Sequence, residues 1–177
     1  MPTKHENRMI KYKDTKCFKY TNPNPFYNIT SDCVFRAFSL AFDKDWELMA
    51  TMLSAYTIPL GGTALDTEFY GKFLDELGIK KQKQPRLANG KKFTGEAFCK
   101  AHPTGIYLAH IGGHHIVCIK QGVIKDTWNS SRKCIGNYWV ISETDVLGDV
   151  LKDRFRKFKD DLLAETIKRI EKLQWQP

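Results

Sequence analysis

The stretch "GGHHIVCIKQGVIKDTWN", from Gly112 to Asn129, decides the fold because local signals alone predict a β-hairpin there. Two runs rich in β-branched residues flank Gln121-Gly122, and glycine tolerates the positive φ that a two-residue hairpin loop requires. With this loop, Lys120 pairs with Val123 across the hairpin, and this pair sets the register of both strands.

The predicted register determines which polar side chains of the hairpin meet. Side chains alternate between the two faces of a strand, so His115 and Asp126 share one face as diagonal neighbours. Their backbones would lie roughly 7–8 Å apart, within reach of an imidazole and a carboxylate. His114 and Asn129 would point the other way. A three-residue loop would swap the faces and separate the pair.

A buried helix is predicted earlier in the chain, over "CVFRAFSLAF" (33–42). The segment is apolar almost all round, with interruptions at Arg36 and Ser39. Each residue of the triplet 30–32 is a competent N-cap. Cys33 would therefore be the first helical residue, where the positive end of the helix dipole favours a thiolate.

The remaining periodicities predict an α+β chain with helices first and an antiparallel sheet afterwards. Further helices are expected over 43–56, 63–78 and 94–103, and strands over 105–111, 115–120, 123–128 and 136–142. We predict three parts: a basic arm over 1–20, irregular or strand-containing, a catalytic domain over 21–144, and a long helix over 145–177. The long helix carries an apolar stripe close to a heptad, and either packs on the domain or pairs two chains into a homodimer.

Composition excludes several classes of protein. The 177 residues suit one domain, and no apolar run is long enough to span a membrane. Five cysteines without CxxC spacing fit neither a disulfide framework nor a zinc site, so no metal or cofactor is expected. We expect a cytoplasmic protein without a membrane partner. The net charge is +8, and part of the excess lies in the basic loop 80–92. Such a charge is typical of a soluble basic surface, or of a protein that binds nucleic acid or an acidic protein.

Together, Cys33, His115 and Asp126 form an ordered constellation typical of thiol hydrolases. A His–Asp pair orients an imidazole and supports its charged form, and a thiol at a helix start is the nucleophile that would use it. The competing interpretation is structural. A cysteine in an apolar helix is most often buried core, and a histidine in a strand is usually a satisfied core or surface residue.

Two stretches resemble the papain-like superfamily, and most closely the small papain-fold proteins encoded by bacteriophages and bacteria. "SDCVFRAFSLA" is similar to their nucleophile helix, an Asp-Cys pair followed by two apolar residues, Arg and Ala. "HPTGIYLAHIGGHHIVCIKQGVIKDTWNSSRKCIGNYW" is similar to their later strands. The resemblance covers roughly residues 22–140 and leaves out the N-terminal arm and the last helix.

The resemblance implies roles for individual residues. Cys33 would be the nucleophile, His115 the general base and Asp126 the acid that orients it. In the family the histidine follows a glycine directly, so His114 is an alternative base. By analogy with papain's asparagine, Asn129 is an alternative orienting residue, although the strand parity opposes it.

The resemblance also implies an oxyanion hole, which we expect from the Cys33 N–H and an upstream side-chain amide, for which Asn28 is favoured. The expected fold is papain-like, with a buried nucleophile helix packed on an antiparallel sheet.

The expected function is that of a thiol hydrolase that cleaves a peptide, isopeptide or other amide bond in the cytoplasm of a bacterial host. Its substrate would be acidic if the basic loop 80–92 lines the cleft. Alternatives are a transglutaminase-type or small-amide acyl transferase, and a catalytically silent papain-fold protein that binds nucleic acid or a host protein as a phage-encoded inhibitor.

Overall fold

The computed structural model describes residues 3–142, 156–157, 160–161, 164–165 and 167–172. Within them the chain is α+β, as the periodicities predict. Its elements in chain order are α1 (Lys4–Lys11), β1 (Phe18–Tyr20), α2 (Cys33–Phe42), α3 (Trp46–Thr57), the 3-10 helix η1 (Ile58–Leu60), α4 (Thr67–Glu76), β2 (Lys81–Gln82), α5 (Gly95–Ala101), β3 (Ile106–Ile111), β4 (His115–Lys120), β5 (Val123–Asp126) and β6 (Ile135–Ile141).

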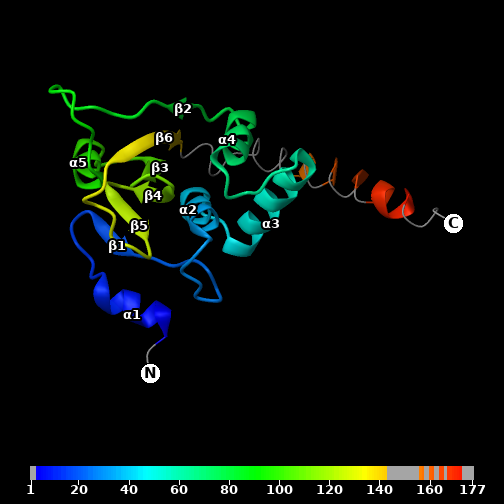
Figure 1. Cartoon of the computed structure of the whole chain (residues 1–177), viewed down its shortest axis with the longest axis horizontal. Coiled ribbons are helices and arrows are strands. Elements are labelled where there is room, and N and C mark those ends of the chain that lie inside the picture. Colours follow the sequence, from blue (N-terminus) through cyan, green and yellow to red (C-terminus); the bar gives the residue numbers. More distant parts are fainter. Residues whose placement is uncertain (1–2, 143–155, 158–159, 162–163, 166, 173–177) are drawn as a thin grey trace.

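The sheet has six strands in the order β1-β5-β4-β3-β6-β2 (Figure 1). The four strands expected over 105–142 form its antiparallel centre. The expectation of a wholly antiparallel sheet is wrong, because β1 pairs parallel to β5 and makes the sheet mixed. Parallel pairing joins segments far apart in the chain, so no local turn signal announces it.

The hairpin between β4 and β5 has the predicted register. Lys120 pairs with Val123 and Cys118 with Lys125. Gln121 and Gly122 have φ values of 53° and 68°, as a type I′ turn requires at both central positions. The start of β4 and the end of β5 therefore lie side by side.

Each face of the sheet carries its own hydrophobic core. Helices α2, α3 and α4 pack on one face, where Phe38, Leu53 and Phe73 of the helices share a core cluster with Trp139 of β6. Helix α5 covers the other face, where Phe98 packs with the side chains of β1, β4 and β5. Because α2 lies between the sheet and the outer helices (Figure 1), its apolar residues are buried on nearly every side.

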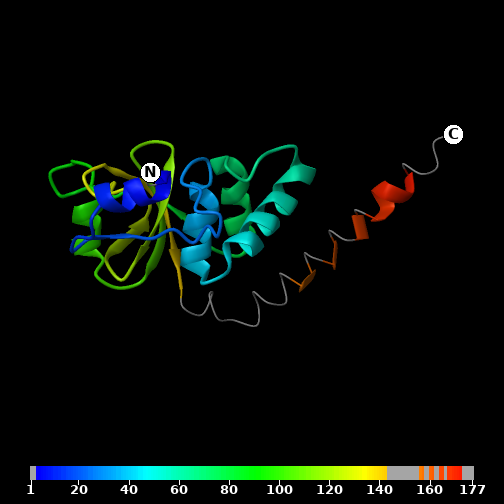
Figure 2. The same cartoon turned by 90° about the horizontal axis from the view of Figure 1, so that it is seen from below.

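The segment 1–20, expected as an arm, contains both a helix and a strand. Helix α1 begins at a capping box, in which Thr3 and Glu6 each satisfy a backbone N–H of the other. It lies beyond the β1 edge of the sheet, and the chain between β1 and α2 passes close to it (Figures 1 and 2).

The long helix predicted over 145–177 falls largely outside the described residues. None of the helices that the structure describes is long and apolar enough to cross a bilayer.

Candidate active site

Helix α2 begins with Cys33 and leaves its first N–H groups without an intrahelical partner. Its N-cap is Asp32, and its first helical bond runs from the Arg36 N–H to the Asp32 carbonyl, at 3.0 Å. The Asp32 side chain makes no capping hydrogen bond. The backbone N–H of Cys33 is therefore available to a group that lies beside the thiol.

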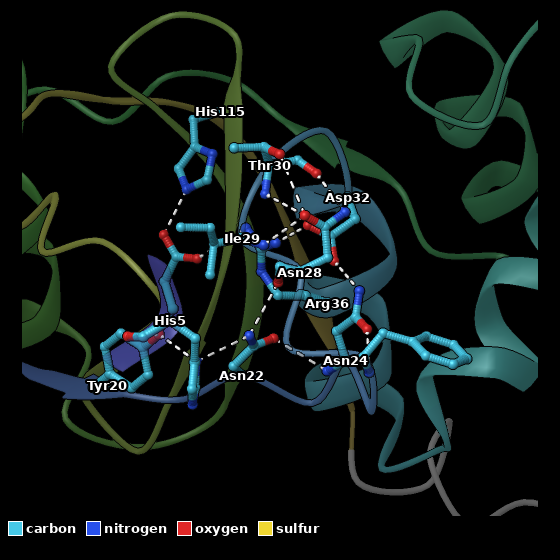
Figure 3. A network of polar contacts seen from close by, with 12 residues as sticks. His5, Tyr20, Asn22, Asn24, Asn28, Ile29, Thr30, Asp32, Arg36 and His115 are labelled. Carbon is cyan, nitrogen blue, oxygen red and sulfur yellow. Dashed lines mark hydrogen bonds and ion pairs between the residues drawn. The ribbon is translucent and has the colours of Figure 1, made fainter. Parts of the chain in front are cut away.

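The Asp32 carboxylate binds other side chains in place of the helix end. It is buried, forms an ion pair with Arg36 and accepts a hydrogen bond of 2.8 Å from Nδ2 of Asn24 (Figure 3). Any residue of the triplet 30–32 could have capped the helix by sequence. The contacts with Arg36 and Asn24 explain why the residue at the cap position does not use its side chain for this purpose.

His115 and Asp126 form the pair that the hairpin register predicts. Nε2 of His115 lies 2.6 Å from Oδ2 of Asp126, and the two side chains are 19% and 3% exposed. Their shared face is also that of Val117 and Ile124, which belong to one core cluster. Because the carboxylate binds Nε2, the ring nitrogen that remains for another partner is Nδ1.

Cys33 lines the same cavity as His115, and each of the two groups shifts the pKa of the other. Burial raises the pKa of the Cys33 thiol, but the hydrogen bond and charge of His115 and the N–H of Ile116 outweigh it, and the net pKa is lowered. Burial lowers the pKa of His115, but its hydrogen bonds to Asp126 and Cys33, with their charges, raise the pKa to about 9. Both shifts act in the direction of a thiolate beside an imidazolium.

A buried guanidinium lies behind this pair. Arg36 is only 3% exposed, contacts Asp32, and places Nη2 3.6 Å from Oδ1 of Asp126. Asp126 is therefore held between an imidazole and a guanidinium. The sequence analysis saw Arg36 only as an interruption of an apolar helix. A charged residue in such a helix, four positions after an acid, is itself the signal of a buried ion pair.

A cavity of about 260 Å³ opens at the thiol. The residues that line it are Arg8, Tyr12, Ile29, Ser31, Cys33, Arg36, His115 and Trp128. The aromatic ring of Trp128 lies edge-on to the His115 imidazole, with centroids 5.2 Å apart. The contribution of the N-terminal segment was missed, although the Thr3-x-x-Glu6 capping box could have predicted the helix that supplies Arg8.

The alternative residues lie elsewhere. His114 is exposed in the turn before β4 and does not line the cavity. The side-chain oxygen of Asn129 accepts a hydrogen bond from the Ser131 N–H. Asn28, favoured as the oxyanion donor, directs its amide NH₂ to the carbonyl of Thr30 and does not line the cavity either. Of the predicted site residues, only Cys33, His115 and Asp126 come together.

The basic loop 80–92 also lies away from the thiol. Its strand β2 forms the edge of the sheet next to β6, with β6 and β3 between it and β4. None of its residues lines the cavity at Cys33. Any cationic attraction at this cavity must come from other side chains.

No protein-family description matches the chain, and no curated protein and no solved structure matches it either. The functional argument therefore depends on the geometry of the site and on the residues that resemble the papain-like superfamily.

Proposed function

We propose that the chain is a thiol hydrolase with a papain-like fold, which cleaves an amide bond through Cys33, His115 and Asp126. One observation carries the proposal. A thiol at the start of a helix lines one cavity with an imidazole, the two shift each other's pKa, and the imidazole is bound by a buried carboxylate. This is the arrangement of an activated nucleophile, its base and the group that orients the base.

Acylation begins from the thiolate–imidazolium pair. The Cys33 sulfur attacks the carbonyl carbon of the amide, a C–S bond forms, and the carbonyl electrons move to the oxygen. The uncapped N–H of Cys33 stabilises this oxyanion. His115 then gives its proton to the amide nitrogen, the C–N bond breaks, and an amine leaves.

Deacylation uses the same groups in reverse order. His115, now neutral, removes a proton from water, and the hydroxide attacks the thioester carbon. The C–S bond breaks, the sulfur leaves as a thiolate, and the carboxylic acid is released. Asp126 keeps the imidazole oriented through both steps and stabilises its charged form. An amine in place of water would yield a new amide, so product analysis distinguishes hydrolysis from acyl transfer.

The proposal is tested by alkylating the chain with iodoacetamide at pH 6 and following each cysteine by mass spectrometry. Because its pKa is lowered, we expect Cys33 to react several-fold faster than the exposed Cys134. Cys33→Ala should abolish turnover of any amide substrate. Equal reactivity of Cys33 and Cys134 at this pH would exclude the mechanism.

A further inference from the structure

The cavity at Cys33 has cationic walls. Its ionisable lining residues other than Cys33 and Tyr12 are Arg8, Arg36 and His115, and within the described part of the chain no carboxylate lines it. The charges of Arg36 and His115 are already balanced by buried carboxylates. Among the described residues, none of the ion pairs involves Arg8. Arg8 therefore supplies the positive charge at the cavity that no carboxylate of the described residues balances.

Helix α1 holds Arg8 in a defined position. His5, Arg8 and Tyr12 follow one another at spacings of three and four, so they share one face of the helix. His5 anchors this face, because its Nδ1 lies 2.9 Å from the Tyr20 hydroxyl (Figure 3). Its ring also packs on Tyr27, with centroids 4.7 Å apart.

The same helix face meets the cavity one turn further on, where Arg8 and Tyr12 both line it. The charge of Arg8 is close enough to the site to lower the pKa of Arg36, although burial is the largest cause of that shift.

The other walls of the cavity suit the apolar part of a substrate. Ile29 is 8% exposed, and the rings of Tyr12 and Trp128 are partly buried. A ligand that fills about 260 Å³ would meet aromatic and aliphatic surface on its flanks and a guanidinium at one side. This combination fits a group that ends in a carboxylate, because a guanidinium can bind both carboxylate oxygens at once.

We propose that this cavity is a substrate subsite for a carboxylate next to the scissile amide, and that Arg8 is the residue that binds and selects this carboxylate. The proposal depends on the proposed function, because the subsite matters only if Cys33 is the nucleophile. The carboxylate has two sources, an acidic side chain or the carboxyl end of a peptide, and their chemistry at Arg8 is the same.

The test compares two alkylating reagents of similar size on the full chain. Iodoacetate carries the carboxylate and iodoacetamide does not. We expect Arg8→Gln to slow the alkylation of Cys33 by iodoacetate about fivefold, which is the effect of one partly exposed charge pair. The iodoacetamide rate should change less than about twofold, since it reports the thiolate fraction and the fold. Arg8→Lys should retain most of the iodoacetate rate because it keeps the charge.

Lys4→Gln is the matched control, because it removes the same charge from an exposed position of the same helix. It should leave the ratio of the two rates unchanged. If Cys33 is no more reactive than Cys134 with either reagent, the proposed function fails. If Cys33 reacts rapidly with iodoacetamide but Arg8→Gln leaves the ratio unchanged, or Lys4→Gln lowers it equally, the subsite alone is wrong.

Three acetylated tripeptides identify the source of the carboxylate by protecting Cys33 from iodoacetamide. One has a central glutamate and an amidated end, one a central glutamine and a free end, and one a central glutamine and an amidated end. Stronger protection by the peptide with the central glutamate would assign the subsite to acidic side chains. Stronger protection by the peptide with the free end would assign it to the carboxyl ends of peptides. Equal protection by all three, or by none, would overturn the subsite. Arg8→Gln should remove the preference.

Discussion

Nη2 of Arg36 lies 3.6 Å from Oδ1 of Asp126, while the other oxygen of that carboxylate binds His115. Arg36 comes from the helix that carries the thiol, and Asp126 from the strand beside the imidazole. The guanidinium therefore connects the two elements that supply the reacting groups. It also pairs with Asp32, so two buried carboxylates share one guanidinium, and Asp126 has His115 as a second partner.

Removing this cation should destabilise the fold. Arg36→Met leaves Asp32 and Asp126 buried without their shared partner, and we expect it to lower the free energy of unfolding by about 3 kcal/mol. Urea denaturation at pH 7 measures the change. The control is Lys72→Met, which removes a lysine from an exposed pair with Glu68 and should cost less than about 0.5 kcal/mol. Equal losses in the two variants would mean that the buried network contributes little.

Asp126→Asn should raise the pH at which Cys33 becomes reactive. The carboxylate raises the pKa of His115, so its loss lets the imidazolium lose its proton at a lower pH and removes the cation that stabilises the thiolate. The carboxylate's repulsion of the thiolate acts in the opposite sense but is the smallest of the influences that set the Cys33 pKa. We expect the midpoint of the iodoacetamide rate against pH to rise by about one unit or more.

Two further variants decide between the alternative site residues. Asn129→Ala and His114→Ala should leave the midpoint of the iodoacetamide rate against pH unchanged, because neither side chain lines the cavity. The Asn129 side chain instead accepts a hydrogen bond from the Ser131 N–H. A shift in Asn129→Ala with none in Asp126→Asn would make Asn129 the orienting residue.

The pair of His115 with Asp126 should make stability fall as the solution becomes alkaline. The folded-state pKa of His115 is raised from 6.5 to about 9, so its contribution is fully present below pH 6.5 and is lost as the pH rises through about 9. Cys33 contributes in the opposite sense, because its folded-state pKa is lowered and the stability it adds is lost as the pH falls through that value. A Cys33→Ala background removes this second effect and leaves the part of the raised His115 pKa that Asp126 causes.

The measurement is urea denaturation at pH 6 and pH 9.5 in that background, with and without His115→Gln. We expect the histidine to add about 1–3 kcal/mol at pH 6 and little at pH 9.5. A difference between the two chains that is the same at both pH values would show that the pair does not titrate in this range.

The sequence predicted those parts of the site that depend on local signals. A two-residue turn fixed the register of the hairpin and with it the meeting of His115 and Asp126. The apolar segment 33–42 placed Cys33 at a helix start. These features need only residues that are close together in the chain.

The remaining parts depend on contacts between distant segments. Strand β1 lies parallel to β5, more than a hundred residues away, and no turn chemistry specifies that pairing. The use of Asp32 as an ion-pair partner in place of a helix cap depends on Asn24 and Arg36. Helix α1 was within reach of local reasoning through its capping box, but its position at the cavity is set by the contacts of His5 with Tyr20 and Tyr27.

A side chain at Gly122 should destabilise the turn that sets the hairpin register. Its φ is +68°, and an added Cβ would lie 3.1 Å from the Cys99 carbonyl oxygen and from Cα of Pro103. Gly122→Ala therefore combines backbone strain with a contact against rigid backbone, and we expect it to lower the free energy of unfolding by about 1–2 kcal/mol.

Gly71→Ala is the matched control, since Gly71 lies in α4 with nothing within 4 Å of an added Cβ. It should stabilise the chain by up to about 1 kcal/mol. Thermal unfolding of the two variants beside the unmodified chain should therefore give shifts of opposite sign, and a neutral Gly122→Ala would show that the turn does not hold the register that brings His115 to Asp126.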